Sequence, residues 1–380
     1  MSSATPLKVL IMAGGTGGHV IPALSVAQVL KSHGVQVEWL GTQAGIEARL
    51  VPASGIPIHW MNITGLRGKS AATLLLAPFR LLSAVMQARR VIKQMQPDAV
   101  LGMGGFASGP GGLAARLLGR RLVIHEQNAI AGMTNRYLAR MAHATAYAFE
   151  GAFERGNNLQ HLGNPVRAEI EDLPAPQERA QNKESNTVNV LILGGSLGAK
   201  ALNDVLPEAL QKARLVEQLR VRHQAGSRNI EEAKVAYSAL STNTQAQVEV
   251  KDFIDDMAAA YAWADLVVCR AGALTVAELA AAGVASILVP YPFAVDDHQT
   301  LNAQVLQRAG ASLVCQQADL TAELLAGLFD QFCEDRERLL LMGEAARSVA
   351  EPRTAERLAA LCLPQLEQVI HESENEGAQA

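Results

Sequence analysis

Short apolar segments alternate with longer amphipathic segments through most of this chain, and that alternation is typical of βαβ units around a parallel sheet. The predicted strands form two series, which are 8–13, 35–40, 99–101, 122–125 and 144–149, then 188–193, 221–224, 248–250, 266–269 and 286–290. Between them, residues 168–187 contain Pro174, Pro176 and many polar side chains, which predicts a linker. Because 380 residues exceed the usual size of one domain, we expect two α/β domains, 1–167 and 168–350.

The composition narrows the class of protein. A formal net charge of −4 argues against a general nucleic-acid-binding protein. The four cysteines are scattered without a C-x-x-C pair, so we expect buried thiols rather than a metal site. Residues 1–6 are polar and lead directly into a strand, and the uncharged stretch 99–115 is interrupted by glycines. We therefore expect neither a signal peptide nor a membrane span, and a cytoplasmic protein.

A glycine-rich turn, Gly14-Gly15-Thr16-Gly17-Gly18-His19, follows the first predicted strand and precedes a helical pattern. Glycines let the backbone approach a phosphate, and a helix amino terminus adds N–H groups and a favourable dipole. The spacing differs from that of a Walker loop and fits a dinucleotide fingerprint poorly. The turn is either a diphosphate cradle or a tight turn without a ligand. His19 favours a function, because imidazole exchanges protons near neutral pH.

The second series of strands opens in the same way, since Gly194-Gly195-Ser196-Leu197-Gly198-Ala199 follows the strand at 188–193 and precedes a helix near Lys200 to Ala213. The same physics makes this turn a second anion site, with a turn that binds nothing as the alternative. Two such turns at the carboxyl ends of two parallel sheets predict that ligands bind at those ends, in a cleft between facing domains.

The segment after the strand at 266–269 contains Thr275 and, three residues later, Glu278. This spacing is that of a capping box, in which Thr275 begins a helix and Glu278 serves only the helix terminus. A carboxylate at the carboxyl edge of a sheet can equally bind the two hydroxyls of a ribose. The local sequence leaves both interpretations open.

The loop 290–303 carries amide and histidine side chains that suit a hydroxyl-rich ligand. The pairs Asp255-Asp256 and Asp296-Asp297 are possible metal ligands. Adjacent acidic side chains point in different directions, however, and both pairs fall at predicted helix starts, where the helix dipole favours acids. The sequence therefore favours helix starts over a metal site.

Residues 65–93 combine leucines and Phe79 with the cations Arg67, Lys69, Arg80, Arg89, Arg90 and Lys93. Apolar side chains flanked by cations suit a helix at the surface of an anionic membrane. A core helix with a solvated basic edge is the alternative, and the membrane interpretation gains weight only if the substrate is a lipid.

Six motifs occur in order between about Lys8 and Leu363, and together they resemble the MurG family of UDP-N-acetylglucosamine-dependent transferases. They are the turn from Gly14 to His19, Gly102-Met103-Gly104-Gly105-Phe106-Ala107-Ser108-Gly109-Pro110, His125-Glu126-Gln127-Asn128-Ala129, Gly163-Asn164-Pro165-Val166-Arg167, the turn from Gly194 to Ala199, and the segment from Gly272 to Glu278. Two positions depart from the family pattern. Leu197 stands where many members have Gln, and Phe106 where others have Tyr, which puts a nucleotide contact and an acceptor hydroxyl contact in doubt.

The resemblance implies a GT-B fold, in which two Rossmann-like domains with parallel sheets face a deep cleft and a carboxyl-terminal helix at about 351–367 returns to the first domain. It implies a first domain that faces the acceptor and the membrane, and a second domain that binds the UDP-sugar. The implied donor-binding residues are Thr16, Gly17, Gly18, Asn128, Arg167, Ser196, Ile254, Ala273, Leu274, Thr275, Val276, Ala277, Glu278 and Gln299. The implied acceptor-binding residues are Gly15, Phe106, Glu126 and Asn135.

The implied reaction is transfer of N-acetylglucosamine, with inversion, to the C4 hydroxyl of a muramyl-pentapeptide on undecaprenyl pyrophosphate. His19 is the candidate base, with a phosphate-binding or orienting role as the alternative. Helix amino termini with Arg167 would stabilise the departing UDP without a metal or cofactor. The implied partners are UDP-N-acetylglucosamine, the lipid-linked acceptor and anionic lipid at the cytoplasmic face of the inner membrane, without nucleic acid. The alternatives are a GT-B enzyme with another acceptor, a UDP-sugar epimerase of the same fold, and a membrane-surface scaffold without catalysis.

Overall fold

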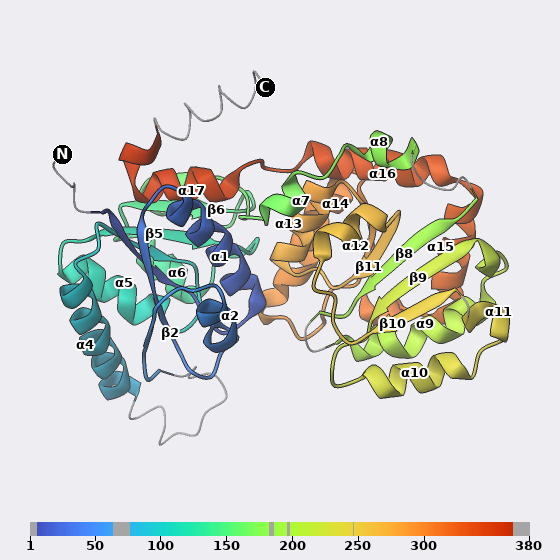
Figure 1. Cartoon of the computed structure of the whole chain (residues 1–380), viewed down its shortest axis with the longest axis horizontal. Helices are drawn as coiled ribbons and strands as arrows, with labels where there is room; N and C mark the ends of the chain where they lie inside the picture. Colours follow the sequence, from blue (N-terminus) through green and yellow to red (C-terminus); the bar gives the residue numbers. More distant parts are fainter. Residues whose placement is uncertain (1–5, 64–76, 182–185, 196–197, 246, 368–380) are drawn as a thin grey trace. The chain divides into compact units, whose positions relative to one another are not determined.

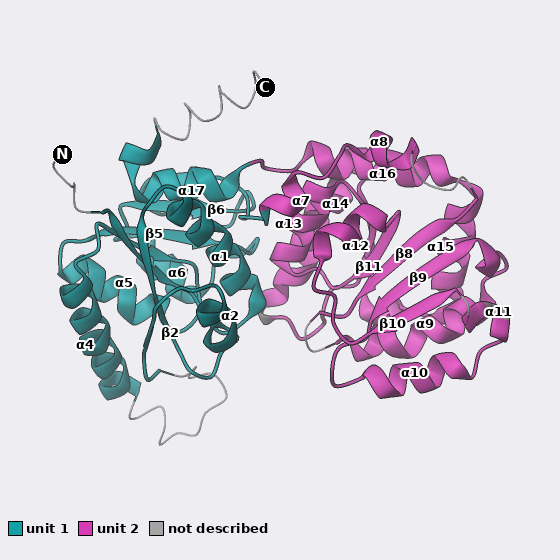
Figure 2. Ribbon diagram, in the orientation of Figure 1, with its two compact units in different colours: residues 1–167, 353–380 teal, residues 168–352 magenta. Residues whose placement is uncertain are grey.

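The computed structural model describes residues 6–63, 77–181, 186–195, 198–245 and 247–367. The chain divides into two compact units, shown in different colours in Figure 2. Unit 1 comprises residues 1–167 and 353–380, and unit 2 comprises residues 168–352.

Unit 1 is built on a seven-stranded parallel sheet with the strand order β3-β2-β1-β4-β5-β6-β7. Its strands are β1 Lys8–Met12, β2 Gln36–Gly41, β3 Ile58–Trp60, β4 Ala99–Gly102, β5 Arg121–Glu126, β6 Ala144–Tyr147 and β7 Leu159–His161. Its helices are α1 Gly17–Ser32, α2 Glu47–Ala53, α4 Ala77–Met95, α5 Ser108–Leu117, α6 Met133–Leu138 and α17 Thr354–Cys362, followed by η4 Pro364–Leu366 (Figure 1).

Both faces of this sheet are covered because β1 is apolar at every position after Lys8. Successive side chains of a strand point to opposite faces. Val9 and Ile11 accordingly pack into one cluster with α1, α2 and α17. Leu10 and Met12 pack into a second cluster with α4, α5 and α6. The two clusters form the core of unit 1 and hold the carboxyl ends of its strands in place.

Helix α17 belongs to unit 1 although residues 168–352, which form unit 2, separate it from the rest of that unit in sequence. It packs against α1. The hydroxyl of Thr354 donates to the carbonyl oxygen of Leu162 at 2.7 Å, and Arg121 donates to that of Leu361 at 3.1 Å. The chain therefore enters unit 1 twice.

Unit 2 is built on a six-stranded parallel sheet with the strand order β10-β9-β8-β11-β12-β13. Its strands are β8 Val188–Leu193, β9 Leu219–Gln224, β10 Val248–Lys251, β11 Leu266–Cys269, β12 Ala285–Leu288 and β13 Ser312–Val314. Its helices are α7 Ala168–Glu171, α8 Pro176–Gln181, α9 Lys200–Lys212, α10 Ile230–Ser238, α11 Thr242–Gln245, α12 Met257–Trp263, α13 Ala273–Ala282, α14 His298–Arg308, α15 Ala322–Glu334 and α16 Arg336–Ser348, with short 3-10 turns η1 Val216–Gln218, η2 Val295–Asp297 and η3 Gln317–Asp319.

All ten predicted strands form, with ends that differ by a few residues, and the predicted α/β class with parallel sheets is confirmed. The strands that sequence reasoning missed are β3, β7 and β13. Each has three residues and lies at an edge of its sheet, where its side chains are mostly half-buried. An edge strand of this length lacks the apolar run on which a strand prediction depends.

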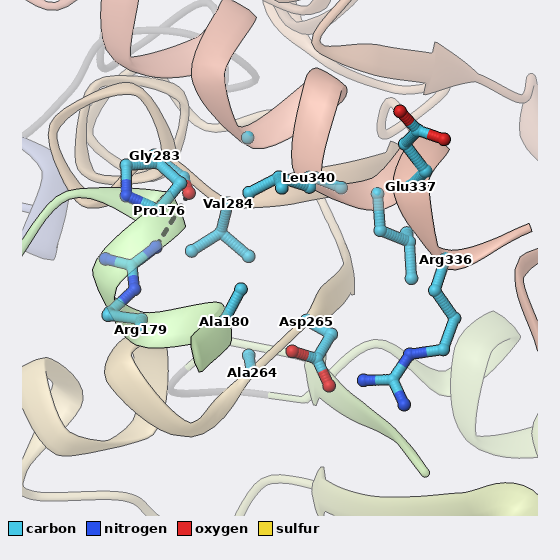
Figure 3. A pocket seen from close by; sticks show the side chains of 13 residues that line it. Pro176, Arg179, Ala180, Ala264, Asp265, Gly283, Val284, Arg336, Glu337 and Leu340 are labelled. Atoms are coloured by element: carbon cyan, nitrogen blue, oxygen red, sulfur yellow. Dashed lines mark hydrogen bonds between the residues drawn. The ribbon is translucent and has the colours of Figure 1, made fainter. Parts of the chain in front are cut away.

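The predicted linker at 168–187 is not a loop at 168–171 and 176–181, because α7 and α8 form there and belong to unit 2. The guanidinium of Arg179 on α8 donates to the carbonyl oxygen of Ala282, the last residue of α13. It also donates to that of Gly283, the next residue, at 2.7 Å (Figure 3). Arg347 on α16 donates to the carbonyl oxygens of Glu171 and Leu173 at 2.9 and 3.3 Å. These charge-assisted hydrogen bonds hold residues 168–181 in place within unit 2, although the prolines and polar residues of this segment are typical of a loop.

The hollow in Figure 3 has a volume of about 260 Å³ and is lined by Arg179, Asp265, Val284 and Arg336, among others. Asp265 directly precedes β11, and Ala285, which also lines the hollow, begins β12. The hollow therefore lies at the amino ends of these strands, and the predicted ligand-binding turns lie at their carboxyl ends. In the part of the chain that the structure describes, no helix is long and apolar enough to span a membrane.

Candidate functional site

The predicted glycine turn of unit 1 leads from β1 into α1. In the sheet, β2 lies on one side of β1 and β4 on the other, so the direction of strand order changes between β1 and β4. Ligands of open α/β sheets bind at the carboxyl ends of strands at such a position. Gly15 has φ +89°, a conformation that glycine adopts without steric cost. The turn is thus placed where the fold class binds ligands.

Thr16 is the residue before α1, but its side chain does not cap the helix. Its hydroxyl Oγ1 instead lies 3.2 Å from Nδ1 of His19, on the first turn of the helix. His19 is half-buried and Thr16 is exposed. Nδ1 of His19 therefore has a hydrogen-bond partner in the turn itself.

Two side chains, one on β2 and one on α2, form hydrogen bonds with the backbone of this turn. The carboxylate of Glu47, at the start of α2, accepts a hydrogen bond from the Gly15 N–H at 2.9 Å. The indole N–H of Trp39 on β2 donates to the carbonyl oxygen of Ala13 at 2.8 Å. Both side chains are fully buried. Sequence reasoning missed both, because nothing in the sequence shows that they lie under the turn.

The segment after β4 packs directly against the turn. Gly104 and Gly105 have φ +97° and +83°. A side chain at Gly104 would overlap the ring of His19, and one at Gly105 would overlap the carbonyl oxygen of Gly14. The hydroxyl of Ser108 accepts from the Gly104 N–H at 3.1 Å and lies 3.0 Å from the carbonyl oxygen of Met12. Close packing of the two loops therefore requires these glycines. The neighbouring Phe106 has 51% of its surface exposed.

Glu126, the last residue of β5, is buried and accepts four hydrogen bonds. Its Oε1 accepts from the backbone N–H and the side-chain amide of Asn128, at 3.0 and 3.2 Å. Its Oε2 accepts from the Gly132 N–H at 3.1 Å and from the Asn135 amide at 2.8 Å. The carboxylate thus ties residues 128–135 together, and its hydrogen bonds are made within the protein.

His125 and Gln127 flank Glu126. Burial lowers the pKa of His125 to about 4, with His19 nearby acting in the same direction, so this imidazole is neutral at pH 7. Its Nε2 is 2.8 Å from the carbonyl oxygen of Gly163, and its Nδ1 is 3.2 Å from the amide nitrogen of Gln127. The neutral form therefore donates from Nε2 and accepts at Nδ1. The Gln127 amide also donates to the carbonyl oxygen of Met103 at 2.8 Å, which links the ends of β4 and β5.

In unit 2 the corresponding change of strand order falls between β8 and β11. Gly195 and Gly198 in the turn after β8 have φ +75° and +77°. Ser196 and Leu197 lie outside the described residues. Below the turn, the Asn203 amide on α9 donates to the carbonyl oxygen of Ala225 at 3.0 Å, and its oxygen lies 3.0 Å from Nε2 of the buried His223.

The structure of the segment after β11 distinguishes between the two interpretations of Glu278. Helix α13 begins at Ala273, with Gly272 as the residue before it, so Thr275 lies inside the helix. The capping-box interpretation is therefore wrong, because it required the helix to begin at Thr275. Glu278 is buried in the second turn of α13, and the hydroxyl of Tyr261 on α12 donates to its Oε2 at 3.0 Å. Ala273, Leu274 and Val276 are buried beside it, and Thr275 and Ala277 are half-buried.

The remaining predicted residues lie on separate elements. Gln299, on the first turn of α14, accepts a hydrogen bond at Oε1 from the Tyr291 N–H at 2.9 Å. Ile254 is half-buried after β10, a strand separated from β11 by β9 and β8. Arg167, also half-buried, is the last residue of the first stretch of unit 1. Helix α13 and the turn after β8 thus follow two neighbouring central strands, whereas Ile254 follows the edge strand β10.

Both aspartate pairs lie at helix starts, as predicted. The Asp256 carboxylate accepts from the Ala259 N–H at 2.8 Å and caps α12, and Asp297 directly precedes α14. Among the described residues, no group of three or more His, Cys, Asp and Glu side chains is placed to hold a metal ion.

Comparison with known proteins places both units in one family. Residues 9–147 match the model of the glycosyltransferase family 28 N-terminal domain, and residues 189–358 match that of the family 28 C-terminal domain. Two similar proteins are both named UDP-N-acetylglucosamine--N-acetylmuramyl-(pentapeptide) pyrophosphoryl-undecaprenol N-acetylglucosamine transferase. The protein from Chromohalobacter salexigens is 52% identical, over 96% of this chain and 98% of its own length. That from Marinobacter nauticus is 48% identical, over 96% of this chain and 99% of its own.

Solved structures agree with these relatives. The crystal structure of MurG from Acinetobacter baumannii superposes with a TM-score of 0.80 at 44% identity, over 94% of this chain and 99% of that one. A glycosyltransferase of kitacinnamycin superposes with a TM-score of 0.67 at 15% identity, over 94% of this chain and 98% of that one. The second likeness shows a shared fold, and the first extends to the sequence.

Proposed function

This chain belongs to glycosyltransferase family 28, and we propose that it has the activity given in the names of its curated relatives. It transfers N-acetylglucosamine from UDP-N-acetylglucosamine to the muramyl-pentapeptide carried on undecaprenyl pyrophosphate, a step of peptidoglycan biosynthesis. The observation that carries this conclusion is the 48% to 52% identity to proteins of that name over 96% of the chain. The predicted GT-B class, with two Rossmann-like domains, agrees with the same comparisons.

Unit 2 binds the UDP-sugar in this proposal. The Glu278 carboxylate accepts hydrogen bonds from the ribose hydroxyls, and the hydroxyl of Tyr261 supports its orientation. Helix α13 begins at Ala273, shortly after β11, and α9 begins at Lys200, after the turn that follows β8, so the amino ends of both helices lie at the carboxyl ends of those strands. Helix amino termini stabilise a diphosphate and the charge that develops on it when UDP departs. Gln299 and Ile254 belong to the same proposed set.

His19 in unit 1 is the proposed base that removes the proton from the acceptor C4 hydroxyl. A neutral imidazole accepts a proton at only one ring nitrogen. The Thr16 hydroxyl lies 3.2 Å from Nδ1, and a hydroxyl can either accept from Nδ1–H or donate to Nδ1. In the proposed form, Nδ1–H donates to that hydroxyl. Nε2 is then the basic nitrogen. In that form the Thr16 hydroxyl orients the His19 ring.

Glu126 and Asn135 are proposed to act on the acceptor through the loop that they order. The four hydrogen bonds accepted by Glu126 support a positioning role, since its oxygens are engaged by residues 128–135. Asn128 and the exposed Phe106 are then the side chains of this region that face the substrates. Gly15 contributes to the acceptor site through its backbone conformation and its carbonyl oxygen, because its N–H already donates to Glu47.

The first two turns of α4 are proposed to contact anionic lipid at the cytoplasmic membrane face. Phe79 and Leu82 have 72% and 61% of their surfaces exposed. Arg80 and Arg90 are exposed on the same helix, whose buried face consists of later residues from Ala84 to Met95. Exposed apolar side chains next to cations suit a surface that touches a membrane without crossing it. The predicted Lys69 and Leu74 to Leu76 lie outside the described residues.

The test is to incubate the protein with labelled UDP-N-acetylglucosamine and the lipid-linked muramyl-pentapeptide. Formation of a lipid-linked disaccharide supports the proposal. Conversion of the UDP-sugar without acceptor would indicate an epimerase, and transfer only to another acceptor would indicate a different glycosyltransferase. Absence of UDP binding would indicate a scaffold.

A further inference from the structure

Glu47 carries a buried carboxylate directly beneath the glycine turn of unit 1. It is fully buried, so it touches no substrate. Oε1 accepts from the Thr42 N–H at 3.0 Å and from the Thr42 hydroxyl at 2.7 Å, and Oε2 accepts from the Gly15 N–H at 2.9 Å. Hydrogen bonds to an ionised carboxylate are stronger than those between neutral groups, and they gain strength away from water.

Glycines make the space that this carboxylate occupies. A Cβ added at Gly14 or at Gly45 would overlap the Glu47 carboxylate, and one at Gly41 would lie 3.0 Å from its Cγ. Gly41 ends β2, and Gly45 is in the loop before α2, so three separate points of the backbone approach one side chain. The backbone at Gly14, Gly41 and Gly45 is therefore packed tightly against the Glu47 side chain.

The bond from Gly15 determines where the next residues lie. Gly15 is at φ +89°, Thr16 directly precedes α1, and the Thr16 hydroxyl lies 3.2 Å from Nδ1 of His19. We propose that Glu47 is a positioning residue, which holds the glycine turn at Gly15 and through Thr16 places the His19 ring for proton transfer. This inference rests on the proposed function of His19.

Glu47→Gln tests the bond at Gly15 while preserving the size of the side chain. The amide has one acceptor oxygen, which satisfies two donors at Thr42 but only one at Gly15, so the oxygen should face Thr42. The amide NH₂ then opposes the Gly15 N–H, donor against donor. Glu47→Met removes the acceptor in any orientation. Thr42→Val is the matched control, because it removes a bond to the same carboxylate and leaves the Gly15 bond intact.

Three measurements are made on each variant: kcat at saturating substrates, UDP binding, and amide hydrogen exchange at Gly15 without substrate. Misplacement of a catalytic group by about 1 Å costs on the order of 10²-fold in rate. We expect Glu47→Gln and Glu47→Met to lower kcat by about that factor, to speed exchange at Gly15, and to leave UDP binding by unit 2 unchanged. Thr42→Val should keep most of the wild-type kcat.

A loss of stability alone is controlled by Thr354→Val, which removes a buried hydrogen bond of unit 1 on α17, away from the turn. If Thr354→Val lowers kcat as much as the Glu47 variants do, or if either Glu47 variant keeps its kcat, the positioning role is overturned. Unchanged exchange at Gly15 in Glu47→Met would also overturn it. Failure of the proposed function is distinguishable, since the wild-type protein would then form no disaccharide.

Discussion

The hydroxyl of Tyr261 donates a hydrogen bond of 3.0 Å to Oε2 of Glu278, and both side chains are buried in unit 2. Tyr261 belongs to α12, which precedes β11, and Glu278 to α13, which follows it. The bond therefore joins the two helices that flank one central strand. It gives the carboxylate a fixed direction, which a ribose-binding group requires.

Replacement of Glu278 by Ala should raise the KM for the UDP-sugar much more than that for the lipid acceptor. Loss of hydrogen bonds to a charged group costs roughly 1.5 to 3 kcal/mol. Tyr261→Phe keeps the carboxylate and loses only its support, so it should raise the same KM by a smaller factor. Thermal melts with and without UDP supply the check: the melt without UDP should change little, and the stabilisation by UDP should shrink. Equal increases in both KM values would argue against a donor role.

His19→Ala should lower kcat by roughly 10² to 10⁴, the usual contribution of a positioned proton-transfer group. UDP affinity should stay close to that of the wild type, because the residue lies in unit 1. The acidic limb of the pH profile of kcat should also change, since the titrating imidazole is gone. Near-normal turnover at saturating substrates would place the base elsewhere and leave His19 with a structural role.

Charge reversal at Arg80 and Arg90 should reduce sedimentation with anionic vesicles and slow transfer to an acceptor embedded in them. Each cation near an anionic surface contributes about 1 kcal/mol, and this part is screened by salt. The apolar contribution of Phe79 and Leu82 is not screened, so wild-type binding should weaken with salt but persist. A short-chain, water-soluble acceptor is the control, with which transfer should be unaffected. Equal losses with both acceptors would show that these residues support the fold instead.

Stability should fall between pH 7 and pH 5, in part through His223. Burial lowers its pKa from 6.5 to about 4. Between pH 6.5 and about pH 4, the imidazole is therefore protonated in the unfolded chain but neutral in the folded chain. The free energy of unfolding accordingly decreases as the pH falls through this range. The expected loss at pH 5 is about 2 kcal/mol from this group. Denaturant unfolding of wild type and His223→Gln at the two pH values measures it, and the variant should lose less. Equal losses would exclude this histidine as a source.

Much of the fold could be predicted because its signals are local. The apolar run at 188–193 is long enough to be a buried parallel strand by itself, and it forms β8 as predicted. The glycine turns at Gly14 and Gly194 follow strands directly, so their place at the carboxyl ends of sheets follows from chain direction alone. Edge strands such as β7 escaped prediction, because three half-buried residues carry no pattern.

The candidate site was predictable only in its motifs. Residues from Gly14 to His19 and from Gly272 to Glu278 are contiguous, so their chemistry is visible in the chain. The partners of those motifs are not contiguous. Glu47 lies 32 residues from Gly15, and Tyr261 lies 17 residues from Glu278. A lone acidic or aromatic residue in a sequence gives no indication of the backbone that it will meet.

The sequence by itself therefore determined the class of fold, the order of its strands along the chain and the family of its motifs, since each depends on neighbours in sequence. Tertiary structure alone decided where α13 begins, which excluded the capping box at Thr275. It also decided which buried groups hold the site, because the hydrogen bonds of Glu47, Glu126 and Tyr261 join segments brought together only when the sheets are packed. Buried polar groups must find partners wherever the fold supplies them, and that requirement acts through space rather than along the chain.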